Sequence, residues 1–116
     1  MNNYDKSLKL FYGQIRSRSA IKVLCVDCVY DDSSKREFVF LGFFTGHGGM
    51  RGLFSRPLTK EYFFGTLYKG EAIDSLNPIS PEGVDTIPDS ISLAIKDVWQ
   101  SKKPITLSKG KRISEP

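Results

Sequence analysis

The sequence predicts an α+β fold, with a mainly antiparallel sheet of about five strands and one amphipathic C-terminal helix packed on it. β-branched and aromatic residues are concentrated in runs such as 21–30 and 37–44, which is typical of strands. A helical repeat of apolar residues follows only near the C-terminus, at 90–103. The length of 116 residues is that of one domain, so we expect a single α+β domain over 1–116.

The first part of the chain is predicted to supply most of the sheet. Residues 8–15 alternate loosely between apolar and polar side chains and are interpreted as a first strand. The runs 21–30 and 37–44 are joined by a polar turn, which predicts a hairpin. Neither run alternates cleanly, so we expect both strands to be central, with both faces covered. Further strands are expected at 53–58 and 60–70.

The remaining residues predict a long loop, the helix and a last strand. Three prolines and one glycine lie within 76–90, and we expect no regular element there. In 90–103, apolar residues recur at i, i+3, i+4, i+7 and i+8, which predicts a helix with one apolar face. Pro104 should end this helix. Residues 105–113 are interpreted as a final strand, or as a hairpin that turns at 109–110.

Charge is distributed unevenly along the chain, although its net value is only +4. Residues 1–70 carry 11 basic and 6 acidic side chains. Residues 71–101 carry one basic and six acidic side chains, and residues 102–116 carry five basic and one acidic. Such asymmetry bears on partners rather than on fold. A polyanion would be attracted to the two ends of the chain and repelled by its middle.

No targeting or membrane segment is expected. The longest clean apolar run is 38–44, only seven residues, whereas a spanning helix needs about 18 or more. The apolar stretch near the N-terminus, 10–12, is too short for a signal peptide. We therefore expect a cytoplasmic protein without membrane contact.

Four glycines and the only histidine make 46–52 the most unusual stretch of the sequence. A dinucleotide-binding fingerprint would need a third glycine where Arg51 stands, and a helix after it. The backbone amides could instead form a small anion-binding nest near Arg51 and Arg56. The stretch is interpreted as a turn between two strands, with a binding loop as the open alternative.

Catalytic and metal-binding motifs are weak. His47 could serve a small hydrolase as a base, but no recognisable nucleophile motif accompanies it. Cys25 and Cys28 are three residues apart in a strand, so their thiols should point to opposite faces and form no redox pair or zinc site. No cofactor and no metal are expected.

The function predicted from these features is that of a small non-enzymatic binding module. It would act on a nucleic acid, or on a protein complex that handles nucleic acid, by presenting charged patches on a compact α+β scaffold. The oligomeric state is left open. The residues expected to make the contacts are His47, Arg51, Phe54, Arg56, Lys109, Lys111 and Arg112.

The alternative is a phage- or plasmid-type inhibitor or immunity protein, which would block a partner enzyme by docking. The acidic segment 71–97 would then be the contact surface, mimicking a nucleic acid. A structural role for the same stretch is equally open, in which Ile79, Val84 and Ile87 hold the loop against the sheet. The residues expected in an acidic docking loop are Glu71, Asp74, Glu82 and Asp85.

Overall fold

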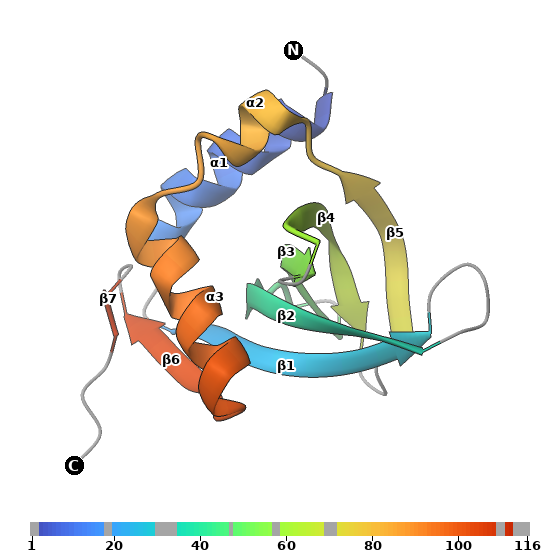
Figure 1. The fold of residues 1–116 in the computed structure, drawn as a ribbon. Coiled ribbons are helices and arrows are strands. Elements are labelled where there is room, and N and C mark those ends of the chain that lie inside the picture. Colours follow the sequence, from blue (N-terminus) through green and yellow to red (C-terminus); the bar gives the residue numbers. More distant parts are fainter. Residues whose placement is uncertain are drawn as a thin grey trace.

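A single curved sheet organises the computed structural model (Figure 1). The residues that the structure describes are 3–17, 20–29, 35–46, 48–56, 59–68, 72–108 and 111–112. They form three helices, α1 (Asn3–Ser17), α2 (Pro81–Val84) and α3 (Asp89–Ser101). They also form seven strands, β1 (Ile21–Val29), β2 (Lys35–Phe44), β3 (Gly49–Arg56), β4 (Glu61–Tyr68), β5 (Ala72–Pro78), β6 (Ile105–Ser108) and β7 (Lys111–Arg112).

The strands pair in the order β5-β4-β3-β2-β1-β6-β7, and every neighbouring pair is antiparallel. The hairpin expected from 21–30 and 37–44 is confirmed, because β1 pairs with β2 in a register that joins Lys22 to Gly42 and Val29 to Lys35. Both strands are interior to the sheet, as expected. The mainly antiparallel α+β class is therefore confirmed, with more strands and helices than the sequence predicted.

The first element is a helix, and the prediction of a strand at 8–15 is wrong. Leu8, Phe11, Tyr12 and Ile15 follow a helical spacing of i, i+3, i+4 and i+7, and all four are buried. Strand alternation would have placed Leu10 beside Leu8 on the buried face, but Leu10 is 72% exposed. The helical stripe prevails because it buries more apolar surface against the sheet.

The segment 76–90 is also more regular than expected, since it contains the end of β5 and the short helix α2. Its prolines lie at positions where the element does not need a hydrogen bond from the backbone N–H. Pro78 is the last residue of β5, and Pro81 lies in the first turn of α2. The Ser80 side chain caps α2 by accepting a hydrogen bond of 3.1 Å from the Gly83 N–H. Pro88 immediately precedes α3.

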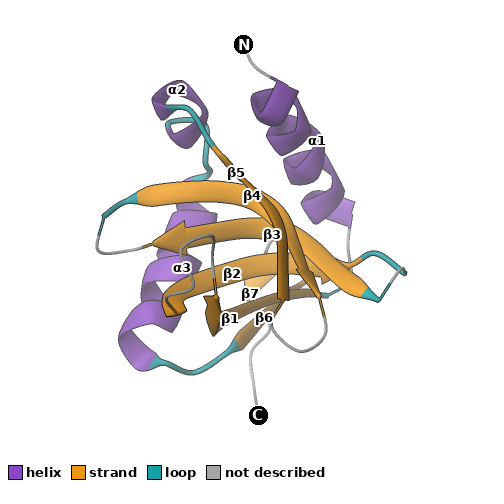
Figure 2. Ribbon diagram, turned by 90° about the vertical axis from the view of Figure 1, so that its right-hand side faces the viewer, coloured by secondary structure: helices purple, strands orange, loops and turns teal. Residues whose placement is uncertain are grey.

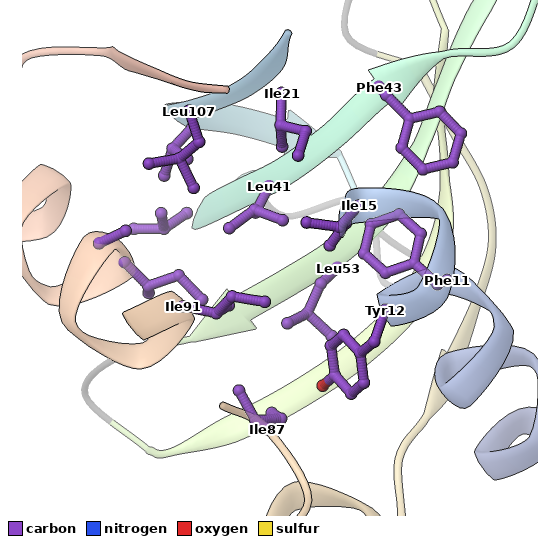
Figure 3. Close-up of a cluster of buried hydrophobic side chains, with 14 of the residues drawn as sticks. Phe11, Tyr12, Ile15, Ile21, Leu41, Phe43, Leu53, Ile87, Ile91 and Leu107 are labelled. Atoms are coloured by element: carbon purple, nitrogen blue, oxygen red, sulfur yellow. The ribbon is translucent and has the colours of Figure 1, made fainter. Parts of the chain in front are cut away.

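The helices pack on one face of the sheet, and we call the resulting cluster the helix-facing core (Figures 1 and 3). It joins Leu8, Phe11, Tyr12 and Ile15 of α1 to Val39, Leu41 and Leu53 of the sheet. The predicted C-terminal helix is confirmed as α3, although it spans 89–101 rather than 90–103. Its buried residues are Ile91, Ala94, Ile95 and Val98, which match the predicted stripe, while Trp99 is partly buried.

The other face of the sheet folds onto itself and forms what we call the sheet core. Phenylalanine rings dominate it, and Phe38 meets Phe54 and Phe63 edge to face, at centroid distances of 5.8 and 6.2 Å. Every buried member lies in a strand of the sheet; they are Val26, Phe38, Phe40, Phe54, Phe63, Leu67 and Leu76. Strands β1 and β2 thus have both faces covered, as the sequence predicts.

A row of glycines accounts for the tight curl. Gly42, Gly52 and Gly65 are in register on three neighbouring strands and are all buried. A Cβ atom at Gly52 would collide with the Leu41 carbonyl oxygen and lie 2.7 Å from Cα of Gly42. Side chains in this row would therefore push β2 and β3 apart, so the glycines permit the close approach that a strongly curved sheet needs. Figure 2 shows this curvature, with α1 and α3 on either side of the view.

Candidate functional site

The glycine-rich stretch begins with the turn between β2 and β3, as expected. The Thr45 N–H and the Thr45 hydroxyl both donate to the carbonyl oxygen of Gly49, at 3.1 and 3.0 Å. Gly46 and Gly48 have φ angles of +88° and +82°, which residues with a side chain rarely adopt. These two glycines are thus explained by turn geometry. His47, and with it the prediction of a small hydrolase, lies outside the described residues.

Beside this turn, a hollow of about 300 Å³ lies between α1 and strands β2 to β4; we call it the α1 hollow. Its floor contains three phenyl rings from three elements. The Phe11 ring stacks on Phe43 at a centroid distance of 5.2 Å and meets Phe64 edge-on at 5.4 Å, and Figure 3 shows Phe11 beside Phe43. The lining residues are Ser7, Leu10, Phe11, Gln14, Phe43, Thr45, Arg51 and Phe64.

Arg51 is the charged residue of this lining. It is exposed, and its guanidinium carbon lies 4.9 Å from the centroid of the Phe64 ring. Such a cation–π contact is worth about 0.5–1 kcal/mol at an exposed site, and it holds the guanidinium over the Phe64 ring. None of the described residues that line the hollow has a carboxylate. The exposed residue Lys6 lies one helical turn before Leu10, on the same side of α1.

The other predicted cations in the described part of the chain, Arg56, Lys111 and Arg112, lie in places different from that of Arg51. Arg56 ends the same strand, five residues away, and forms an ion pair of 3.1 Å with Glu61. An odd separation along a strand places two residues on opposite faces. Lys111 and Arg112 are in β7, and β2, β1 and β6 lie between that strand and β3. Lys109 is outside the described residues.

Phe54 must be removed from the predicted contact residues. Its side chain is 0% exposed, and its ring packs in the sheet core against Phe38 and Phe40, at centroid distances of 5.8 and 4.8 Å. Because the curl of the sheet encloses this face, Phe54 cannot reach a partner while the fold is intact. It is a core residue.

The part of the acidic segment from 79 to 87 packs against the rest of the protein, in the way expected for Ile79, Val84 and Ile87. Ile79 and Ile87 are buried in the helix-facing core, and Val84 is partly buried against it. Glu82 and Asp85 remain exposed, on α2 and at its C-terminal end. Asp74 lies in β5 opposite Thr66, and Glu71 is outside the described residues.

A second hollow, of about 370 Å³, lies where α2 meets the edge of the sheet. Unlike the α1 hollow, it is lined by both signs of charge, with Lys60, Glu61 and Asp85 among its residues. It brings one predicted acidic residue, Asp85, next to the Arg56–Glu61 ion pair at the start of β4. Its mixed charge gives it no clear preference for an anion or a cation.

Two further groups, Cys25 and Tyr12, are partly or fully buried in the fold. The Cys25 thiol donates a weak hydrogen bond of 3.8 Å to the Val98 carbonyl. Partial burial raises the pKa of this thiol, while smaller effects of Lys102 and Glu37 lower and raise it, respectively. The Tyr12 hydroxyl is buried and has no hydrogen-bond partner among the described residues. Burial, with a smaller effect of Tyr62, raises its pKa above the ordinary value.

No metal site forms within the described part of the chain, where no three His, Cys, Asp or Glu side chains gather. None of the described helices has the length and apolar character needed to cross a membrane.

Sequence reasoning missed the α1 side of the hollow. Leu10 lines it and is 72% exposed, away from the buried stripe of the helix. An apolar residue outside the buried stripe of a helix was the available signal, but it can be recognised only once 8–15 is known to be helical.

No protein-family model, curated protein or solved structure matches this chain.

Proposed function

We propose that the protein is a non-enzymatic, cytoplasmic binding module that acts on nucleic acid, bound directly or within a protein complex that handles it. The observation that supports this most is that Arg51 borders a hollow whose described lining has no carboxylate. An exposed cation together with the exposed apolar side chain of Leu10 suits a ligand that carries both phosphates and flat bases. The contact residues proposed are Arg51 in β3 and Lys6 in α1.

Arg51 differs from two other described cations in having a ring rather than a carboxylate as its partner. Arg56 pairs with Glu61 and Lys102 pairs with Glu37, both at distances close to 3 Å. Arg51 rests on a ring instead, and no ion pair joins it to a described carboxylate. A guanidinium over a ring can still direct N–H donors in its own plane toward a phosphate.

Titration of short labelled oligonucleotides at several salt concentrations tests this proposal. Single-stranded DNA, single-stranded RNA and duplex DNA are compared by fluorescence anisotropy. Two phosphate contacts on a single strand, by Arg51 and Lys6, predict that log K falls with log salt with a slope of about −1.4. Arg51→Gln should lower affinity and make the slope shallower by about 0.7. Lys96→Gln, which removes an exposed cation of α3, is the matched control and should change neither. Absence of binding to all three nucleic acids at low salt would contradict the proposal.

An inhibitor that docks on a basic partner is the second candidate, and one observation favours it. Residues 71–95 contain five carboxylates and no basic residue. In the structure, Glu82, Asp85 and Asp89 are exposed on a segment that buried isoleucines hold in place, so its charges are presented without a large ordering cost. If this candidate is right, a protein partner captured by the wild-type chain is lost on Glu82→Gln/Asp85→Asn, whereas Arg51→Gln retains it.

A further inference from the structure

We infer that the α1 hollow holds one unpaired base of a single-stranded nucleic acid, with Leu10 packed on the base and Arg51 on a neighbouring phosphate. This inference rests on the proposed function and specifies its ligand. It concerns the place where α1 meets the turn between β2 and β3, and it adds Leu10 and Thr45 to the contact residues.

The size of the hollow suits one ring system. Its volume of about 300 Å³ lies at the lower end of the range for small-molecule sites, roughly 300–1,000 Å³. The three floor rings, Phe11, Phe43 and Phe64, are at most 4% exposed and pack on one another. The floor is therefore formed before any ligand arrives, and binding needs little ordering of side chains.

The rim supplies the groups that a base and its phosphate need. Leu10 is 72% exposed at one side, so a ligand that covers it removes apolar surface from water. The Thr45 hydroxyl already donates to the Gly49 carbonyl, which leaves its oxygen able to accept a hydrogen bond from a base amino group. Arg51 lies over the Phe64 ring. Ser7 and Gln14 have contacts of their own within the fold, and the inference does not depend on them.

Charge complementarity favours a nucleic acid over other ligands with a flat ring. The described lining combines one cation with no carboxylate, and Lys6, one turn before Leu10 on α1, adds a second positive charge. A neutral aromatic ligand would make no use of these two cations. An acidic peptide would use the cations, but its carboxylate side chains would not cover the apolar side chain of Leu10.

The base must be unpaired to enter. In a duplex, the base edges are occupied by pairing and the faces by stacking, so that entry would require the base to be flipped out at a cost in free energy. A single strand already exposes its bases, and aromatic or apolar side chains commonly take up their faces. We therefore expect single strands to bind more tightly than a duplex of the same sequence.

The test compares an eight-nucleotide single strand with an abasic strand that has the same number of phosphates. We expect the strand with bases to bind at least tenfold more tightly. Leu10→Ser should weaken its binding about fivefold to tenfold without altering the salt slope, because no charge changes. Leu93→Ser is the matched control, since Leu93 is 65% exposed on α3, and it should have less than a twofold effect. Thermal unfolding of each variant verifies that it is folded.

The outcomes separate the inference from the function on which it rests. Equal affinity for the abasic strand, or no effect of Leu10→Ser, would overturn the base-binding site while nucleic-acid binding stands. Duplex binding as tight as that of the single strand would also overturn it. Displacement of the strand by polyglutamate of equal charge at the same concentration would assign the hollow to acidic peptides. Failure of every nucleic acid to bind would refute the proposed function itself.

Discussion

Substitution of Gly52 by alanine should strongly destabilise the fold, because the account depends on the close approach of β2 and β3 at the glycine row. The new Cβ atom would collide with the Leu41 carbonyl oxygen and lie 2.7 and 2.8 Å from two further backbone atoms of β2. Backbone atoms cannot turn aside as a flexible side chain can. Relief requires the two strands to separate locally, which weakens the ladder hydrogen bonds around Leu41↔Leu53.

The expected cost combines two contributions. Overpacking of a close-packed interior costs about 1–3 kcal/mol, and each weakened backbone hydrogen bond adds roughly 1 kcal/mol. We therefore expect Gly52→Ala to lower the free energy of unfolding by about 3 kcal/mol. At about 4 °C per kcal/mol for a chain of this size, Tm should fall by roughly 12 °C.

Urea and thermal unfolding followed by circular dichroism measure this effect. Gly13→Ala is the matched control, because Gly13 is exposed in α1 and a Cβ atom there would meet nothing within 4 Å. It should stabilise the protein by up to about 1 kcal/mol, the helix-propensity difference between the two residues. A lower free energy of unfolding for Gly52→Ala and a higher one for Gly13→Ala would support the close packing of β2 and β3 in the curved sheet. A Gly52→Ala protein as stable as the wild type would refute the strand packing described here.

Three further predictions concern single side chains. Tyr12→Phe removes a buried hydroxyl without a described partner and should stabilise the protein by about 1 kcal/mol in urea unfolding. Burial raises the pKa of Tyr12, so above about pH 10 the unfolded state loses the phenolic proton while the folded state retains it. The stability of the wild type should therefore fall above about pH 10, and the stability of Tyr12→Phe should fall less. Lys102→Met removes an ion pair of 3.2 Å with Glu37 and a cation 3.2 Å from the Trp99 ring centroid, both partly exposed. It should cost at most about 1 kcal/mol, and the difference should shrink in 1 M salt. Phe54→Leu should lower the free energy of unfolding by roughly 1–3 kcal/mol, measured by chemical denaturation. It should leave the nucleic-acid affinity of the folded protein unchanged. A loss of affinity without a loss of stability would show that Phe54 is a contact residue after all.

The elements that sequence reasoning predicted well are those whose pattern has one interpretation. In α3, the spacing of Ile91, Ala94, Ile95 and Val98 fits only a helix, and the helix forms there. In α1, the apolar residues fit two periods, because Leu8, Leu10 and Tyr12 alternate while Leu8, Phe11, Tyr12 and Ile15 repeat helically. Burial against the sheet decides between the two, and burial depends on elements far along the chain.

Prolines misled the prediction for a related reason. A count of prolines within 76–90 argues against regular structure, but their effect depends on position. Pro78 ends a strand and Pro81 begins a helix, so neither removes a hydrogen bond that its element needs. Ser80 before Pro81 was the local signal for a helix start, since serine is a favoured N-cap and proline a favoured first-turn residue.

The candidate site was only partly predictable. The glycine-rich turn and Arg51 stand out in the sequence, and both border the α1 hollow. Leu10 and Phe64 join them only because α1 packs beside β4, a contact between residues more than fifty positions apart. Phe54 was predicted as a contact residue because its burial, too, depends on contacts that appear only in the folded sheet. The curl that buries it follows from Gly42, Gly52 and Gly65 being in register, and that alignment exists only in the paired sheet.

Mapping of backbone amide shifts by NMR, as an eight-nucleotide single strand is added to the ¹⁵N-labelled protein, tests the central claim most directly. We expect shifts around the α1 hollow, at Leu10, Thr45 and Arg51, and unchanged signals at Glu82 and Asp89 on the acidic side. Shifts confined to α2 and the start of α3, or no shifts at low salt, would contradict it.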